Sequence, residues 1–220
     1  MNVRTTIVFS SLALIYLATL PLTPYVAQFL PKALPIVVLA VFAYTKLSAM
    51  PRYMVLTALL FSLAGDVSLA LPFADSFITG LACFFVAHLT YAMCFALLHR
   101  RLVETPGDHI ISRKPKWFIS IIMVSFAVMM AVHILPTSKA LFYPVVAYIS
   151  VITLMGLTAV WLAQTKLIVT GALLFVISDA ILAQSVFKIP LPLSTFWVMT
   201  TYYGAQYCLT MGLVDVFFEK

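Results

Sequence analysis

The sequence predicts an all-α integral membrane protein, a single domain over residues 1–220 that forms a bundle of eight transmembrane helices. Two observations predict this fold class: 64% of the 220 residues are hydrophobic, and only 9% are charged. A soluble domain is nearer half apolar and a quarter charged. One span takes about 20 residues, so the chain has room for roughly eight spans and little else. Any function must therefore lie within the bundle, in the cell or inner membrane.

Apolar runs separated by proline or by Lys and Arg define the spans in chain order. The first starts like a signal peptide, but no small-residue cleavage site precedes "PLTPY", so we keep it as a span. The second is the shortest and carries Lys46 near its end. A polar stretch at residues 99–116, with "TPGD" as its turn, predicts a loop between spans four and five. The predicted spans cover residues 6–22, 34–49, 53–71, 77–98, 117–135, 140–163, 167–187 and 194–214.

The basic residues predict the orientation of the bundle. With eight spans, both termini and the loops after spans two, four and six share one side of the membrane. That side holds ten Lys and Arg, whereas the other holds only Lys32, Lys139 and Lys188. Because basic residues concentrate on the cytoplasmic side, both termini are predicted to be cytoplasmic. The net charge of +6 is explained by this topology and by lipid headgroups, so we expect membrane lipid and no nucleic acid as partner.

Spans three and seven resemble each other. Span three reads "ALLFSLAGDVSLAL" and span seven "ALLFVISDAILAQ", and their acids, Asp66 and Asp179, lie 113 residues apart, about half the chain. The likeness favours a parallel repeat of four plus four helices, although two apolar helices can also share letters through composition alone.

Asp66 and Asp179 are the acids that fall within predicted spans. An ionisable residue at that depth costs roughly 2.5 to 3.5 kcal/mol on insertion scales, so it normally faces the bundle interior and indicates a functional site. No Lys or Arg lies in a comparable stretch of spans three, four, seven or eight. Both acids are predicted in the outer half of the membrane, and Gly65 and Ser178 before them are small enough for close helix approach.

Spans four and eight add polar side chains near mid-membrane. "FFVAHLTYAM" puts His88 and Tyr91 three residues apart on one helical face, and "TTYYGAQYCLT" puts Tyr202 and Gln206 four apart. Each of these residues alone also fits a packing or helix-tying role. Together with the aspartates they predict one buried polar pocket formed by Asp66, His88, Tyr91, Asp179, Tyr202, Tyr203 and Gln206.

Two carboxylates in an apolar cavity favour one protonated and one ionised form. Such a pair suits a general acid beside a base that activates water, and equally a proton-coupled transporter that uses the acids as proton sites. No metal-ligand spacing such as HxxxH occurs, no G-x-S-x-G is present, and the three cysteines lie in apolar runs without CxxC spacing. We therefore expect neither a metal site nor a serine lipase.

Four segments, "AGDVSLAL", "GLACFFVAHLTYA", "GALLFVISDAILA" and "TYYGAQ", resemble the YhhN-like family of membrane proteins, which includes the lysoplasmalogenases. The resemblance implies an eight-span hydrolase that cleaves the vinyl ether bond of a lysoplasmalogen, a lysophospholipid, to a fatty aldehyde and a glycerophospho-headgroup. For this reaction we expect Asp66 and Asp179 to form the catalytic acid–base pair, with the two roles left unassigned, and His88, Tyr91, Tyr202, Tyr203 and Gln206 to place water or substrate. No cofactor is needed for this chemistry. Transport remains the alternative, but spans three and seven lack the prolines expected of broken transporter helices.

Overall fold

A computed structural model describes residues 3–25, 27–104, 113–163 and 165–218. In this part of the chain the secondary structure is entirely helical, without strands. Seven of the helices are long and apolar enough to cross a membrane, so the protein is a multi-pass membrane protein. The eight long helices are α1 (Val3–Thr19), α2 (Phe29–Lys46), α3 (Ala49–Ala70), α4 (Ser76–Glu104), α5 (Arg113–Ile134), α6 (Phe142–Thr158), α7 (Lys166–Phe187) and α8 (Ser194–Phe218).

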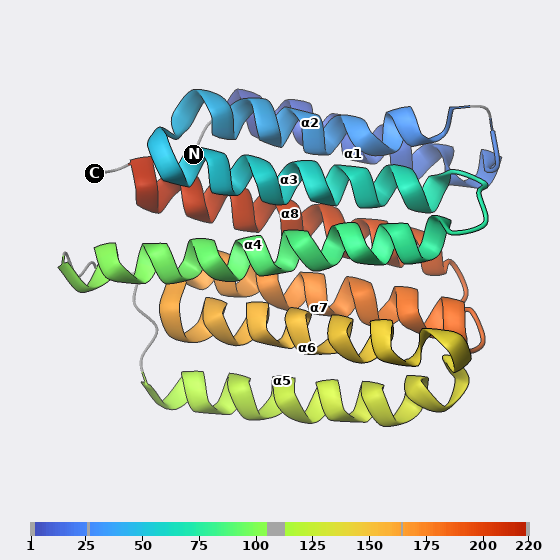
Figure 1. Ribbon diagram of the computed structural model, residues 1–220. Coiled ribbons are helices and arrows are strands. Elements are labelled where there is room, and N and C mark those ends of the chain that lie inside the picture. Colours follow the sequence, from blue (N-terminus) through green and yellow to red (C-terminus); the bar gives the residue numbers. More distant parts are fainter. Residues whose placement is uncertain (1–2, 26, 105–112, 164, 219–220) are drawn as a thin grey trace.

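The helices run side by side along one axis, and consecutive helices alternate in direction (Figure 1). Both termini, the α2–α3 and α6–α7 connections, the last turn of α4 and the first turn of α5 lie at one end of the bundle, which we call the terminal end. The α1–α2, α3–α4, α5–α6 and α7–α8 connections lie at the other end, which we call the loop end. Exposed large apolar residues, among them Ile7, Val41, Leu60 and Val132, cover the outside of the bundle, where lipid would surround them.

Helix α8 is outside the group of seven helices that are long and apolar enough to cross a membrane. It carries Thr201, Tyr202 and Gln206, yet half of its described side chains are buried and only three are exposed. It packs against α1, α2, α3 and α7, so its polar groups meet protein instead of lipid. The polar sequence of α8 thus follows from its interior position.

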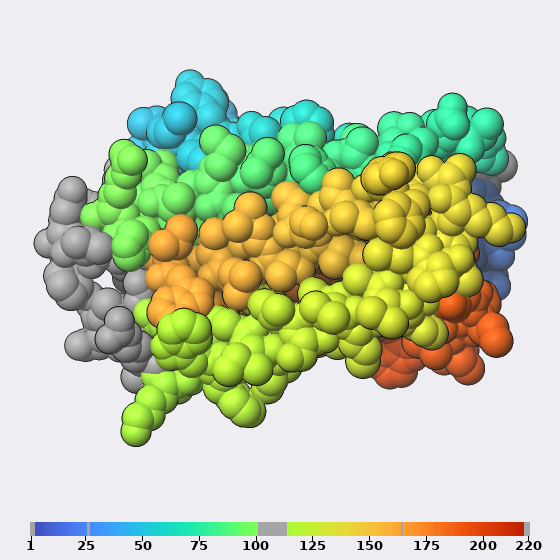
Figure 2. Space-filling view, turned by 60° about the horizontal axis from the view of Figure 1, so that its bottom comes forward, coloured from blue at the N-terminus to red at the C-terminus, as the bar shows by residue number. Residues whose placement is uncertain are grey.

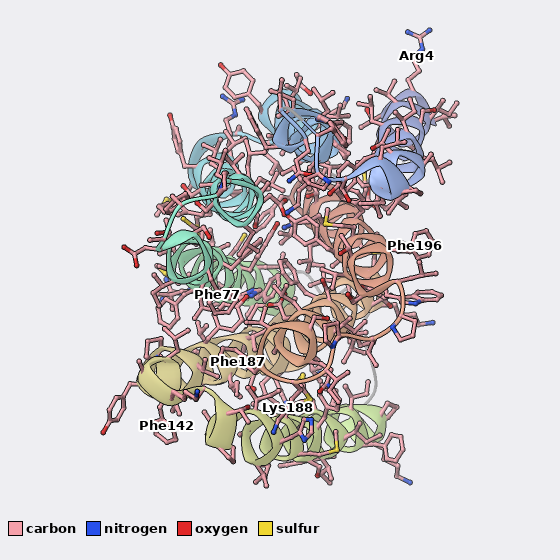
Figure 3. All side chains as sticks on the ribbon, turned by 90° about the vertical axis from the view of Figure 1, so that its right-hand side faces the viewer. Arg4, Phe77, Phe142, Phe187, Lys188 and Phe196 are labelled. Atoms are coloured by element: carbon pink, nitrogen blue, oxygen red, sulfur yellow. The ribbon has the colours of Figure 1, made fainter. Side chains whose placement is uncertain are left out.

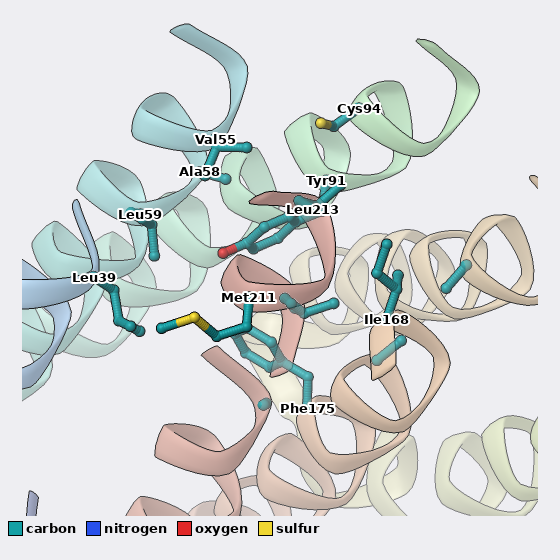
Figure 4. Close-up of a cluster of buried hydrophobic side chains, with 14 of the residues drawn as sticks. Leu39, Val55, Ala58, Leu59, Tyr91, Cys94, Ile168, Phe175, Met211 and Leu213 are labelled. Atoms are coloured by element: carbon teal, nitrogen blue, oxygen red, sulfur yellow. The ribbon is translucent and has the colours of Figure 1, made fainter. Parts of the chain in front are cut away.

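The half of the bundle near the terminal end is filled by side chains. Leu59 of α3, Tyr91 of α4, Ile168 of α7 and Met211 of α8 are almost fully inaccessible, and Figure 4 shows these residues converging from neighbouring helices. Gly171 allows α7 and α8 to approach closely, because a Cβ there would lie 2.9 Å from the backbone nitrogen of Leu209. This packed half supports the cavities of the other half.

Three predicted boundaries were wrong. Helix α2 begins at Phe29 instead of residue 34: Pro31 falls in its first turn, where a missing N–H group costs little, and Pro35 lies inside the helix. Helix α4 continues to Glu104 and α5 begins at Arg113, so both enter the predicted loop. The remainder of that loop, including the "TPGD" turn and Asp108, lies outside the described residues.

Candidate functional site

Two hollows lie between the helices in the half of the bundle toward the loop end. The polar cavity has a volume of about 330 Å³, and its lining includes Lys32, Asp66, Ser178, Asp179, Ser194 and Tyr202. The apolar groove has a lining that includes Phe84, Met123, Ala127, Tyr148, Asp179 and Ala180. Both predicted acids thus line the polar cavity, and Asp179 also lines the groove.

Asp66 is paired with a cation that the sequence analysis placed outside the spans. It lies in the last turns of α3, 3% exposed, and its Oδ1 is 3.2 Å from the Lys32 ammonium. Lys32 also donates to the backbone oxygen of Asp66 at 3.1 Å. The expectation that Asp66 has no cationic partner was therefore wrong, because the partner comes from the first turns of α2.

The other oxygen of Asp66, Oδ2, is buried close to the hydroxyl of Tyr202. Within the described part of the chain, Oδ2 accepts no hydrogen bond of good geometry. The hydroxyl of Tyr202 has no such hydrogen bond either. Tyr202 is buried, lines the same cavity, and interacts electrostatically with the Asp66 carboxylate. A buried polar group without a partner is costly, so a water or a substrate group would be held well at this place.

Asp179 has a different set of neighbours. The Tyr148 hydroxyl donates to its Oδ2 at 2.5 Å, and Nε2 of His88 lies 3.1 Å from the same oxygen and 3.0 Å from the Tyr148 oxygen. His88 is fully buried, and its Nδ1 has no hydrogen bond partner among the described residues. We therefore assign a proton to Nε2, which makes His88 a donor to Asp179.

Aromatic rings fix the orientation of these groups. The His88 ring lies edge-on to Phe175, with centroids 4.5 Å apart, and Phe175 and Phe84 both contact the Tyr202 ring. Gly65 makes room for Phe84, since a Cβ there would lie 2.7 Å from the Phe84 ring. The small residue before Asp66 is thus needed for packing against α4, as the sequence predicted.

Three other predicted site residues form contacts behind the cavity. Tyr91 of α4 donates to Oε1 of Gln206 on α8 at 2.7 Å, and both are fully buried. Tyr203 donates to the backbone oxygen of Lys32 at 2.8 Å. These bonds connect α8 to α4 and α2. Neither hollow is lined by Tyr91, Tyr203 or Gln206. These residues therefore lie behind the side chains that surround Asp66 and Asp179.

The sequence analysis missed Lys32 and Tyr148. Lys32 is one of three basic residues on the sparsely charged side, and a lysine next to an apolar run on that side is a usable signal for a buried cation. Tyr148 lies in "FYPVVAYIS", where no spacing distinguishes it from a packing aromatic. In the described part of the chain, no three His, Cys, Asp or Glu side chains come together in the manner of metal ligands.

Comparison with known proteins gives relatives over most of the chain. Lysoplasmalogenase TMEM86B of Homo sapiens is 35% identical over 191 residues, which cover 83% of this chain and 74% of the human protein. Lysoplasmalogenase TMEM86A of Bos taurus is 29% identical over 171 residues, covering 73% of this chain and 65% of the bovine protein. No solved structure matches the chain. The model of the YhhN family matches residues 27–213, and the chain belongs to this family.

Proposed function

We propose that the protein hydrolyses the vinyl ether bond of lysoplasmalogens within the membrane. Relatives named lysoplasmalogenase support this activity. The observation that carries the proposal is that Asp66 and Asp179 line one cavity in different surroundings, one beside an ammonium and the other beside a hydroxyl and an imidazole. Two carboxyl groups whose environments differ in this way divide the roles of acid and base between them.

We propose further that α8 is the eighth span and that both termini lie in the cytoplasm. The even number of helices, with the termini at one end, and the excess of Lys and Arg at that end support this orientation. The polar cavity then lies in the outer half of the membrane. The resemblance between "ALLFSLAGD" and "ALLFVISD" supports a parallel repeat in which Asp66 and Asp179 are equivalent positions.

In our proposal Asp179 is the acid. The hydrogen bonds that the described residues make to it both go to Oδ2, which leaves Oδ1 to carry a proton toward the junction of the two hollows. Asp66 is the base, because the Lys32 ammonium favours its ionised form. Its Oδ2 accepts no protein hydrogen bond of good geometry from the described residues, and in our proposal it accepts one from a water molecule in the cavity that Asp66 lines.

The reaction starts with transfer of the Asp179 proton to the alkene carbon that is not bonded to oxygen. This step leaves an oxocarbenium ion, which the Asp66 carboxylate stabilises. Water adds to the cationic carbon and gives a proton to Asp66, which forms a neutral hemiacetal. The hemiacetal hydroxyl returns its proton to Asp179, the carbon–oxygen bond to glycerol breaks, and Asp66 protonates the departing oxygen. One water is consumed, and both aspartates return to their starting states.

The remaining predicted residues act around this pair. Tyr202 lines the cavity and contacts water or the glycerol part of the substrate. His88 positions Asp179, Tyr203 holds the α2 backbone at Lys32, and the Tyr91–Gln206 bond fixes α4 against α8. These four are positioning residues, whereas Tyr202 touches the substrate.

The activity is tested with the purified protein in detergent. It is incubated with a lysoplasmalogen and, separately, with an acyl lysophospholipid of equal chain length, while fatty aldehyde and free fatty acid are measured. We expect aldehyde from the first substrate and no fatty acid from the second. Fatty acid from the second would identify an ester lipase. The absence of both products would overturn the hydrolase proposal in favour of transport.

Replacing Tyr148 by Phe removes one of the two donors to Oδ2 of Asp179 and leaves the ring in place. We expect kcat for aldehyde release to fall by about ten- to a hundredfold, corresponding to about 1.5 to 3 kcal/mol for a hydrogen bond to a charged group. The pH profile of kcat should shift as well, since the hydroxyl interacts with the group that donates the proton. A Y148F enzyme with an unchanged rate and profile would remove Tyr148 from the site.

A further inference from the structure

The polar cavity and the apolar groove adjoin each other between α3, α4 and α7, at a boundary that we call the passage. The residues that line both hollows are Leu69, Phe77, Phe84, Asp179 and Leu182. Asp179 is the ionisable member of this set, and the other four are apolar. Toward the loop end the passage is bounded by Phe77 and Phe187, whose rings meet edge to face with centroids 5.6 Å apart (Figure 3). A substrate that extended from one hollow into the other would cross this set of residues, with Asp179 among them.

The apolar groove is long and narrow, with a volume of about 80 Å³. On α5 its lining runs from Met123 to Ile134, and on α7 from Val176 to Phe187. Eleven residue steps at about 1.5 Å each give a length of roughly 16 Å, which is about half of the ~30 Å hydrocarbon core of a bilayer. Helices α4 and α6 complete the lining, and Figure 2 shows α4, α6 and α5 next to one another on this face of the molecule.

Small side chains line part of the groove and keep it open. Ala127 of α5 and Ala180 and Ala183 of α7 line it together with methionine and branched aliphatic residues. A hydrocarbon chain would bury apolar surface against these side chains. The polar cavity on the other side of the passage instead offers the Lys32 ammonium and the hydroxyls of Ser194 and other residues, which suit a phosphate and a glycerol.

We propose that the apolar groove binds the alkenyl chain of the substrate and sets the chain-length selectivity, while the glycerophospho part occupies the polar cavity. The vinyl ether then lies at the passage beside Asp179, where the chain and the polar part of the substrate join. This inference rests on the proposed hydrolysis of lysoplasmalogens and adds the direction in which the substrate lies.

The test compares Ala127→Phe with Val128→Phe. Ala127 lines the groove, whereas its neighbour Val128 is 58% exposed on the outside of α5, so the same side chain is introduced either into the groove or toward lipid. We expect A127F to lower kcat/KM at least about tenfold for a hexadecenyl lysoplasmalogen, the scale by which a pocket discriminates apolar size. A short octenyl substrate should be affected much less, and V128F should behave like the wild type with both.

A second measurement covers the case in which A127F is poorly folded. Ala183→Leu adds a smaller side chain on the opposite wall and should change chain-length preference in the same direction. A saturated alkyl ether lysophospholipid has no vinyl ether bond for the enzyme to cleave, so it should inhibit the wild type competitively. We expect it to inhibit A183L at least about tenfold more weakly. Unchanged preference and inhibition in A183L, with active wild type, would overturn the groove assignment alone. A wild type that releases no aldehyde would instead overturn the proposed function.

Discussion

Asp179→Asn should reduce aldehyde release from lysoplasmalogen by about a hundred- to ten-thousandfold, the usual contribution of a general acid. The amide keeps an oxygen that can accept the bonds from Tyr148 and His88, but it has no acidic proton to give to carbon. The effect should lie in kcat, because the chemical step is lost while the hollows that bind the substrate remain. Product formation at saturating substrate, measured for the variant and the wild type, gives this value directly.

The matched control is Asp75→Asn. Asp75 is exposed in the α3–α4 turn, near the same end of the bundle, and its loss should leave kcat unchanged. Thermal unfolding in detergent shows whether each variant is folded. A solvent deuterium isotope effect on the wild-type rate would indicate that proton transfer to carbon limits the reaction. A folded D179N enzyme with full activity would exclude Asp179 as the acid and would direct attention to Asp66.

The fold was largely predictable from the sequence, because one physical requirement determines it. A backbone in lipid must satisfy its own hydrogen bonds, so each long apolar run becomes a helix. Charged residues in the sequence then separate one apolar run from the next. The prediction failed where this signal weakens: Pro31 and Pro35 disguised the start of α2, and the basic residues after Leu98 suggested a loop where α4 continues. In both places a helix persists through residues that more often flank one.

The candidate site was predictable to the extent that its members are chemically out of place. Asp66 and Asp179 are acids in apolar helices, and they do line one cavity. Tyr148 could not be identified in this way, because a tyrosine is common among packing residues and its contact with Asp179 depends on how α6 packs against α7. Spacing along α4 also suggested that His88 and Tyr91 act together. His88 instead forms hydrogen bonds with residues of α6 and α7, whereas Tyr91 forms one with a residue of α8. Side chains on one face of a helix can still serve different neighbours.

The pair formed by Lys32 and Asp66 should give the largest effect on stability. Replacing Lys32 by Met leaves a buried carboxylate without its cation, and replacing Asp66 by Asn leaves a buried ammonium without its anion. Breaking one side of such a pair costs about 3 to 5 kcal/mol. We therefore expect each single variant to unfold at a clearly lower temperature than the wild type. The double variant K32M/D66N, which has no unpaired charge, should recover most of the loss, since the two effects are coupled.

Activity should not recover with stability, and this separates a catalytic from a structural role. In our mechanism Asp66 takes the proton from water, so K32M/D66N should remain at least about a hundredfold below the wild type in aldehyde release, although it is folded. The same purified samples serve both measurements, unfolding temperature and kcat. If the double variant regained wild-type activity along with its stability, the ion pair would serve only to hold α2 against α3, and the base would have to be sought elsewhere along the polar cavity.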